Sequence, residues 1–274
     1  MNSKKYIVAY DFSIVSETAL NHAVKVAKTT GGTVHLLHVV PKPAQLEEAR
    51  THLQQVASAA SRADGVNVEA ITRIGNIFED IANYSEEIKA ELVFMGTHGA
   101  KGWQKISGSY AMKVIESTFT PFIVVQQRKI KDTGYDDIVV PLDFDKNTQQ
   151  KLRIVAEIAK YFNSKAHIVM PHASNSDDRI DLKINLAFAQ KQLKEHNIDF
   201  NAVILDGDFP KEIIKYSVVN DCDLIMIVNS SVEKIAGNLF ASSAEQAIIT
   251  NEAQIPVCLI NPKDLTTGGS SIFN

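Results

Sequence analysis

KYIVAYDF, at residues 5–12, is a short apolar run that ends in an aspartate and a phenylalanine. The pattern returns as DIVVPLDF at residues 137–144, so that Asp11 and Asp143 lie 132 positions apart. The same offset relates His35 to His167 and Gly75 to Gly207. Later, LVFM at 92–95 matches IMIV at 225–228 at an offset of 133, and PFIVV at 121–125 and PVCLI at 256–260 close the two halves. An ordered series at nearly constant offset indicates an internal duplication.

Each half alternates short apolar runs with segments of helical period. Residues 66–71 and 200–205 are expected to form the third strand of each half. Strands that are apolar throughout are typical of a parallel sheet covered by helices on both faces. Five strands alternating with four helices predict a doubly wound α/β fold in each half. Apolar stripes mark three of the helices: Leu20, Ala23, Val24 and Ala27; Leu46, Ala49, Leu53, Val56 and Ala60; Leu182, Leu186, Ala189 and Leu193.

We expect an N-terminal domain over residues 1–128, a linker over 129–136 that turns at Gly134, a C-terminal domain over 137–263 and a flexible tail over 264–274. These domains are called the N-terminal half and the C-terminal half below. The closing strands are apolar edge candidates, and an exposed edge must be paired or covered. Pairing them within one chain would imitate a dimer of single domains. Whether two chains then form a homodimer stays open.

Composition excludes several classes of protein. A net charge of −4 gives no broad basic field for nucleic acid. No apolar run approaches the roughly 20 residues that a membrane-spanning helix needs, and Lys4 and Lys5 lead into a strand rather than a signal peptide. Cys222 and Cys258 sit among apolar residues, which favours buried free thiols over a disulfide. We therefore expect a cytoplasmic protein.

A glycine-rich segment follows the fourth strand of the N-terminal half. It runs GTHGAKG at residues 96–102, and GSYA at 108–111 then opens a helix. Gly96 and Gly99 leave the backbone free to adopt positive φ and let a ligand come close. The helix start at Gly108-Ser109 offers unpaired N–H groups and a dipole that attract phosphate. This segment is neither a Walker A loop nor the dinucleotide fingerprint, and a plain turn is the simpler alternative for it.

Asp11 follows the first strand and is expected at the same edge of the sheet. A carboxylate there suits a ribose hydroxyl or a base amine rather than phosphate. Asp11 and the glycine-rich segment together therefore suit a nucleoside phosphate.

With these residues in view, the chain resembles a tandem member of the universal stress protein family over nearly its whole length. Asp11-Phe12-Ser13, Leu37-His38-Val39, Gly75-Asn76 and the segment from Met95 through Gly108-Ser109 carry the resemblance. It implies an adenine nucleotide alpha hydrolase-like fold, a role in stress regulation, and binding of ATP or AMP, with or without Mg²⁺. It further implies that Asp11 and Val39 contact the adenosine, and that ribose and phosphates are surrounded by Met95, Gly96, Gly99, Gly108, Ser109 and Tyr110.

The sequence departs from the family pattern in both halves. Eight residues separate Gly99 from Gly108, one fewer than the family usually has, and Ala9 replaces a usual proline. In the C-terminal half Asn229, Val232 and Ala241-Ser242 replace the glycines at the matching positions. A β-branched valine resists positive φ. We therefore expect no ATP at the C-terminal half, where Asp143 would instead cap the following helix.

Other chemistry has less support. His35 and His38 point to opposite faces of a strand, and no metal-binding spacing occurs. Ser109 has no histidine and acid placed to make it a nucleophile, so turnover beyond slow ATP hydrolysis is unsupported. Three hypotheses remain: a nucleotide-binding regulator, a stress scaffold that binds a protein or another small molecule without nucleotide, and, least favoured, an enzyme such as a nucleotidyltransferase.

Overall fold

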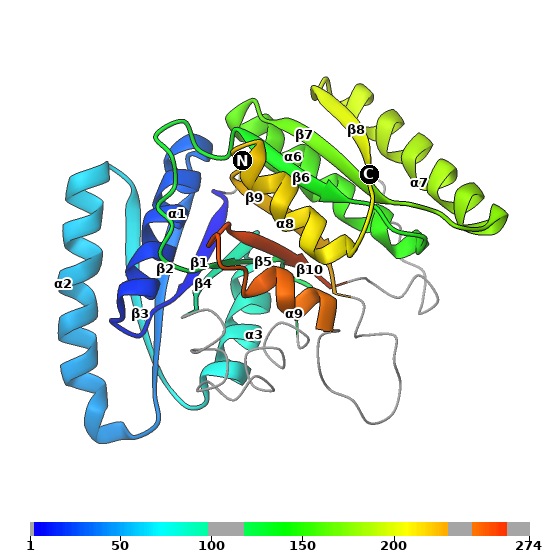
Figure 1. Ribbon diagram of the computed structural model, residues 1–274. Helices are drawn as coiled ribbons and strands as arrows, with labels where there is room; N and C mark the ends of the chain where they lie inside the picture. The colour runs from blue at the N-terminus through cyan, green and yellow to red at the C-terminus, as the bar shows by residue number, and fades with distance from the viewer. Residues whose placement is uncertain (1–2, 98–117, 230–242, 262–274) are drawn as a thin grey trace.

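The computed structural model describes residues 3–97, 118–229 and 243–261 (Figure 1). The strands of the N-terminal half are β1 (Lys5–Ala9), β2 (Thr33–Val40), β3 (Asn67–Ile74), β4 (Leu92–Gly96) and β5 (Phe122–Val125). Its helices are α1 (Ile14–Thr30), η1 (Pro43–Gln45), α2 (Leu46–Asp64) and α3 (Ile77–Ile88). The helix expected to open at Gly108 lies outside the described residues.

The C-terminal half repeats this order. Its strands are β6 (Asp137–Pro141), β7 (Lys165–Pro171), β8 (Phe200–Leu205), β9 (Leu224–Val228) and β10 (Val257–Ile260). Its helices are η2 (Lys146–Lys151), α6 (Leu152–Phe162), α7 (Ser176–Glu195), α8 (Phe209–Val219) and α9 (Ser243–Ile249). The predicted third strands are confirmed, although β3 runs three residues further than expected, to Ile74.

All ten strands form one sheet in the order β3-β2-β1-β4-β5-β10-β9-β6-β7-β8. The strands of each half are parallel to one another, which confirms the doubly wound α/β fold. The halves meet where β5 and β10 pair antiparallel, with Ile123 opposite Cys258. The predicted pairing of the closing strands within one chain is therefore confirmed, and this pairing is called the seam below.

Helices cover both faces of the sheet. α1, α2, α6 and α7 pack on one face, and α3, α8 and α9 pack on the other. In Figure 1, α2 and α7 lie at opposite ends of the molecule. The predicted stripes of α1 are buried, as are Ala49 and Leu53 of α2 and Leu182, Ala189 and Leu193 of α7. Helix α1 ends at Thr30 and is followed by Gly31, whose φ of +68° is the left-handed conformation that glycine tolerates best.

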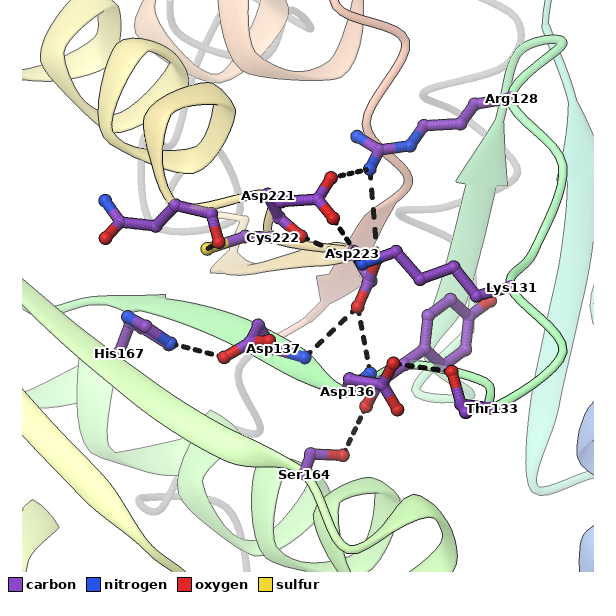
Figure 2. Close-up of polar contacts among 12 residues, drawn as sticks. Arg128, Lys131, Thr133, Asp136, Asp137, Ser164, His167, Asp221, Cys222 and Asp223 are labelled. Atoms are coloured by element: carbon purple, nitrogen blue, oxygen red, sulfur yellow. Dashed lines mark hydrogen bonds and ion pairs between the residues drawn. The ribbon is translucent and has the colours of Figure 1, made fainter.

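The linker is fixed to the C-terminal half by buried and surface charges (Figure 2). Asp223, only 6% exposed, accepts hydrogen bonds from the backbone N–H groups of Asp136 (2.9 Å) and Asp137 (3.2 Å). Lys131 pairs with Asp223 and with Asp221, at 2.8 Å in both cases. Gly134 turns the chain with a φ of +107°, as expected. The linker is thus part of the folded structure rather than a loose tether.

The linker also contacts helix α1 of the N-terminal half. The Nδ1 atom of His22 lies 2.8 Å from the hydroxyl of Tyr135, and its Nε2 atom lies 3.0 Å from the carbonyl oxygen of Arg128. His22 and Tyr135 are both 1% exposed. Burial lowers the pKa of His22 to about 4, so the ring is neutral at pH 7.

Both cysteines are buried free thiols, as expected, and burial raises the pKa of Cys222 to about 12. In the part of the chain that the structure describes, no helix is long and apolar enough to cross a membrane.

Candidate functional site

Four of the predicted site residues lie at the carboxyl ends of three adjacent strands. Asp11 follows β1, Val39 lies near the end of β2, and Met95 and Gly96 end β4. Strand β1 lies between β2 and β4, with Ala9 opposite both Leu37 and Met95. The order of the strands reverses between β1 and β4, and open α/β sheets bind ligands at such a point. The other four predicted residues, Gly99, Gly108, Ser109 and Tyr110, lie outside the described residues.

Asp11 is exposed at this edge and organises the start of α1. Its Oδ1 atom accepts hydrogen bonds from the backbone N–H (3.1 Å) and the hydroxyl (2.5 Å) of Ser13. Ser13 in turn caps α1 by accepting a hydrogen bond from the N–H of Ser16 at 3.2 Å. The carboxylate is therefore held beside a helix N-terminus, at the rim of the sheet.

Gly96 is required for a different reason than expected. Its φ is not positive, so the freedom to adopt positive φ that glycine offers is not used there. A Cβ atom at this position would lie 2.4 Å from the carbonyl carbon of Val15 and 2.7 Å from the backbone nitrogen of Ser16. Glycine is needed because the first turn of α1 packs directly against the end of β4. The close approach brings the helix N-terminus to the candidate site.

Thr97 is a further candidate site residue, which the sequence did not single out. It directly follows β4, is 3% exposed, and donates its backbone N–H to the carbonyl oxygen of Val125 at 2.8 Å. Its buried hydroxyl has no hydrogen-bond partner among the described residues. A buried polar group without a partner is costly. A polar ligand at this edge would use such a donor, so the residues present fit one.

Phe12 was quoted in the motif, but its geometry was not foreseen. It has a φ of +63°, a conformation that is strained for a bulky residue. Its ring is 42% exposed and packs edge-on against Tyr10, at 5.3 Å between centroids, and against His38 at 4.9 Å. The strained residue directly follows Asp11 in the sequence. Its ring, together with those of Tyr10 and His38, forms an aromatic surface beside the site.

At the matching edge of the C-terminal half, side chains occupy the space. Asn229, which replaces Gly96, is fully buried and donates to the side-chain oxygen of Asn261 at 3.0 Å. Asn261 donates across the seam to the carbonyl oxygen of Thr118 at 2.8 Å. Asn229 is therefore part of the contact between the halves. Val232 and Ala241 lie outside the described residues.

The start of the first helix also differs. Residues 146–151 form the 3₁₀ helix η2, where the matching residues 14–19 form the first turns of α1. Lys151 stands where α1 has Ala19, and its buried amine donates to the hydroxyl of Thr148 (2.9 Å) and to the carbonyl oxygen of Pro141. Burial lowers the pKa of Lys151 to about 8, although Asp143 opposes the shift. The expectation that Asp143 caps a helix is wrong: its Oδ1 atom accepts from the N–H of Asp145 at 3.0 Å, ahead of η2.

Two buried histidines repeat with the duplication. The Nδ1 atoms of His35 and His167 lie 2.7 and 2.9 Å from the hydroxyls of Tyr84 and Tyr216. The Nε2 atom of His167 also lies 2.7 Å from Asp137, and burial lowers the pKa of His35. No group of three or more metal-type ligands occurs among the residues that the structure places. These histidines join strands to α3 and α8 within the core.

The comparisons agree with the duplication. The sequence model of the Universal stress protein family matches residues 2–126 and again residues 134–261. "Universal stress protein MJ0531" of Methanocaldococcus jannaschii is 31% identical over 143 residues, which are 46% of this chain and 84% of that protein. "Universal stress protein G" of Salmonella typhimurium is 26% identical over 129 residues, 41% of this chain and 89% of that protein.

Among solved structures, a universal stress protein from Archaeoglobus fulgidus superposes with a TM-score of 0.74 at 20% identity. The superposition covers 95% of this chain and 97% of that one, so the tandem arrangement of the fold is shared. The family match extends over both halves and leaves out little more than the linker and the tail. The chain therefore belongs to the universal stress protein family.

Proposed function

We propose that the N-terminal half binds an adenine nucleotide, ATP or AMP, at the carboxyl edge between β1 and β4, and that binding regulates a cytoplasmic stress response. The observation that carries the proposal is the buried hydroxyl of Thr97, which has no hydrogen-bond partner among the described residues and lies at the point where the strand order reverses. The exposed carboxylate of Asp11 and the helix start packed on Gly96 lie at the same edge.

In this proposal, Asp11 accepts a hydrogen bond from a ribose hydroxyl and Val39 packs on the adenosine. Met95, Gly96, Gly99, Gly108, Ser109 and Tyr110 surround the ribose and the phosphates. The nucleotide acts as a regulatory ligand, with hydrolysis slow at most. The C-terminal half binds no ATP in this way, because Asn229 fills the position of Gly96.

A scaffold that binds a protein without nucleotide is the second candidate. It is favoured by an apolar row on the solvent side of α7, where Ile180, Ile184 and Phe188 are 55%, 47% and 39% exposed. Exposed apolar rows of this kind often mark protein contacts.

The proposal is tested by thermal unfolding of the full chain with ATP, AMP and Mg²⁺. A ligand at 100 times its dissociation constant stabilises the fold by about 2.7 kcal/mol, so the melting temperature should rise. Gly108→Val should abolish the rise, and Ala241→Val, at the matching position of the C-terminal half, should leave it unchanged. No rise with any nucleotide would favour the scaffold. Phosphate release well above about 1 per second would indicate an enzyme instead.

Thr97→Val separates loss of binding from loss of folding. The isosteric change removes a buried hydroxyl that has no partner among the described residues, so the free protein should be as stable as before or more so. The nucleotide-induced rise should nevertheless shrink. A rise that Thr97→Val leaves untouched would remove this residue from the site.

A further inference from the structure

The C-terminal half contains an open pocket that is separate from the nucleotide site proposed above. It has a volume of about 390 Å³ and lies between the end of β7, the first half of α7 and β8. This volume is within the range of small-molecule sites. Apolar side chains form much of its wall, namely those of Met170, Leu182, Leu186 and Ile204.

The pocket exists because α7 packs differently from its counterpart α2. Helix α2 lies along β3 with Leu53 fully buried in the core. At the offset of 132, α7 has Asn185 in place of Leu53. Asn185 is buried and donates to the carbonyl oxygens of Asp143 (2.8 Å) and Asp145 (3.1 Å). Helix α7 is thereby fastened to the chain before η2, and it packs on α6 and η2 rather than along β8.

The charges at the rim of the pocket favour an anion. Arg179 and Lys183 lie one turn apart on α7, and both line the pocket. Within the described part of the chain, neither forms an ion pair; Arg179 donates from Nε to the carbonyl oxygen of Asn175 at 3.2 Å. Two carboxylates nearby have hydrogen-bond partners of their own: the Oδ1 atom of Asp206 lies 3.2 Å from the Nδ1 atom of His172, and Asp178 accepts from the side chain of Asn175 at 2.7 Å.

We propose that this pocket binds an amphipathic anion, a single aliphatic chain with a carboxylate or phosphate head. The chain lies over Met170, Leu182 and Leu186 and covers Ile204, which is 56% exposed and would lose its contact with water. The head lies between Arg179 and Lys183, where charge-assisted hydrogen bonds hold it. The long stems of both side chains allow their charged ends to remain at the rim, in contact with solvent.

The test is calorimetric titration of the full chain with decanoate and with decyl phosphate, both below their micellar concentrations. We expect saturable binding of one molecule per chain. The ligand that binds more tightly shows whether the pocket prefers a carboxylate or a phosphate head group. Decylammonium, which has the same chain and the opposite charge, should not bind. Absence of saturable binding by either anion, or equal binding of decylammonium, would overturn the proposal.

Two pairs of variants locate the site. Ile204→Trp fills the pocket from its exposed wall and should abolish binding, whereas Ile184→Trp, on the outward side of α7, should not. Arg179→Gln with Lys183→Gln should weaken binding roughly tenfold, as loss of charged hydrogen bonds does. Lys191→Gln, on the same helix outside the pocket, is the matched control. The same loss in a control and in its pocket variant would place the ligand elsewhere.

These variants also keep the two proposals apart. Decanoate binding should be unaffected by Gly108→Val, and the thermal shift with ATP should be unaffected by Ile204→Trp. Decanoate binding that disappears in Gly108→Val would mean that the anion occupies the edge of the N-terminal half, against the proposal.

Discussion

The two halves share a fold and differ at a few corresponding positions. At each of these positions the residue type changes how the neighbouring helix or strand packs. The end of β4 carries Gly96 and admits the first turn of α1, whereas Asn229 follows β9 with a buried side chain that bonds toward the seam. Helix α2 has Leu53 in the core, and α7 has Asn185 tied to the chain before η2. One half thus has a glycine at the end of β4, where the first turn of α1 packs against it, and the other has a pocket beside β7 and β8.

The largest expected effect comes from exchanging the second-helix residues. Leu53→Asn should lower the free energy of unfolding by about 3–5 kcal/mol, because it removes a fully buried leucine and leaves a polar group in its place. Asn185→Leu should cost less, about 1–3 kcal/mol, through the lost hydrogen bonds to two carbonyl oxygens. Urea unfolding of both variants measures the difference. Equal costs would mean that the two helices are packed alike.

The next largest effect is the dependence of stability on pH, which we expect to arise in the first helix of the N-terminal half. His22 of α1 corresponds to Ile154 of α6, so only the N-terminal half has a titrating group there. The pKa of His22 is lowered from 6.5 to about 4 in the folded chain. Between about pH 6.5 and pH 4, His22 is therefore protonated in the unfolded chain and neutral in the folded chain. Stability should therefore fall as pH drops through that window, by about 3 kcal/mol in all from this residue.

His22→Gln should remove this contribution while retaining a polar side chain beside Tyr135. Urea unfolding at about pH 7 and about pH 5 gives the two slopes to compare. If the variant loses as much stability as the parent between these values, another group is responsible.

A smaller effect is expected at the strand ends. Gly96→Ala places a Cβ atom within 2.4 Å of Val15 and must displace the start of α1, at a cost of about 1–3 kcal/mol. The nucleotide-induced thermal shift should be lost with it. Asn229→Ala, its counterpart, should leave that shift intact. Unchanged stability in Gly96→Ala would show that α1 can move freely at this point.

The smallest effect is expected from the surface ion pairs of Asp221, which belongs to the C-terminal half. Asp221 is 77% exposed and pairs with Arg128 and Lys131. Asp221→Asn should cost less than about 1 kcal/mol, and the cost should shrink further in high salt. A larger loss, or one that salt does not reduce, would mean that Asp221 has a role beyond surface pairing.

Local patterns predicted most of the helices and strands, because the period of a strand or a helix stripe is set by neighbouring residues. The constant offset between matching motifs predicted the duplication. The seam followed from the apolar closing strands. Features that depend on distant partners were not predictable in the same way. Asp223 contacts Asp136, which is 87 positions away, and no pattern in the sequence near either residue indicates the contact.

The candidate site shows the same division. Asp11 and the end of β4 were placed correctly because parallel strands end at one edge. The packing of α1 against Gly96 was not predicted, because it depends on contacts between residues far apart in the sequence. Thr97 stands within the quoted neighbourhood of Met95 and Gly96, and a hydroxyl residue directly after a buried strand is a signal that could have been used. The burial of Lys151 was not predicted. The corresponding residue of the N-terminal half, Ala19, is small and apolar, so its burial gives no indication that a lysine is buried at the same position.

The antiparallel pairing of β5 with β10 has a consequence for stoichiometry. Two single domains that meet through such strands form a symmetric dimer with two identical sites, and dilution separates them. Here both strands belong to one chain, so their effective concentration does not depend on how much protein is present. A substitution in one half is not copied into the other. The seam therefore keeps the pair together and allows its two halves to acquire different ligands.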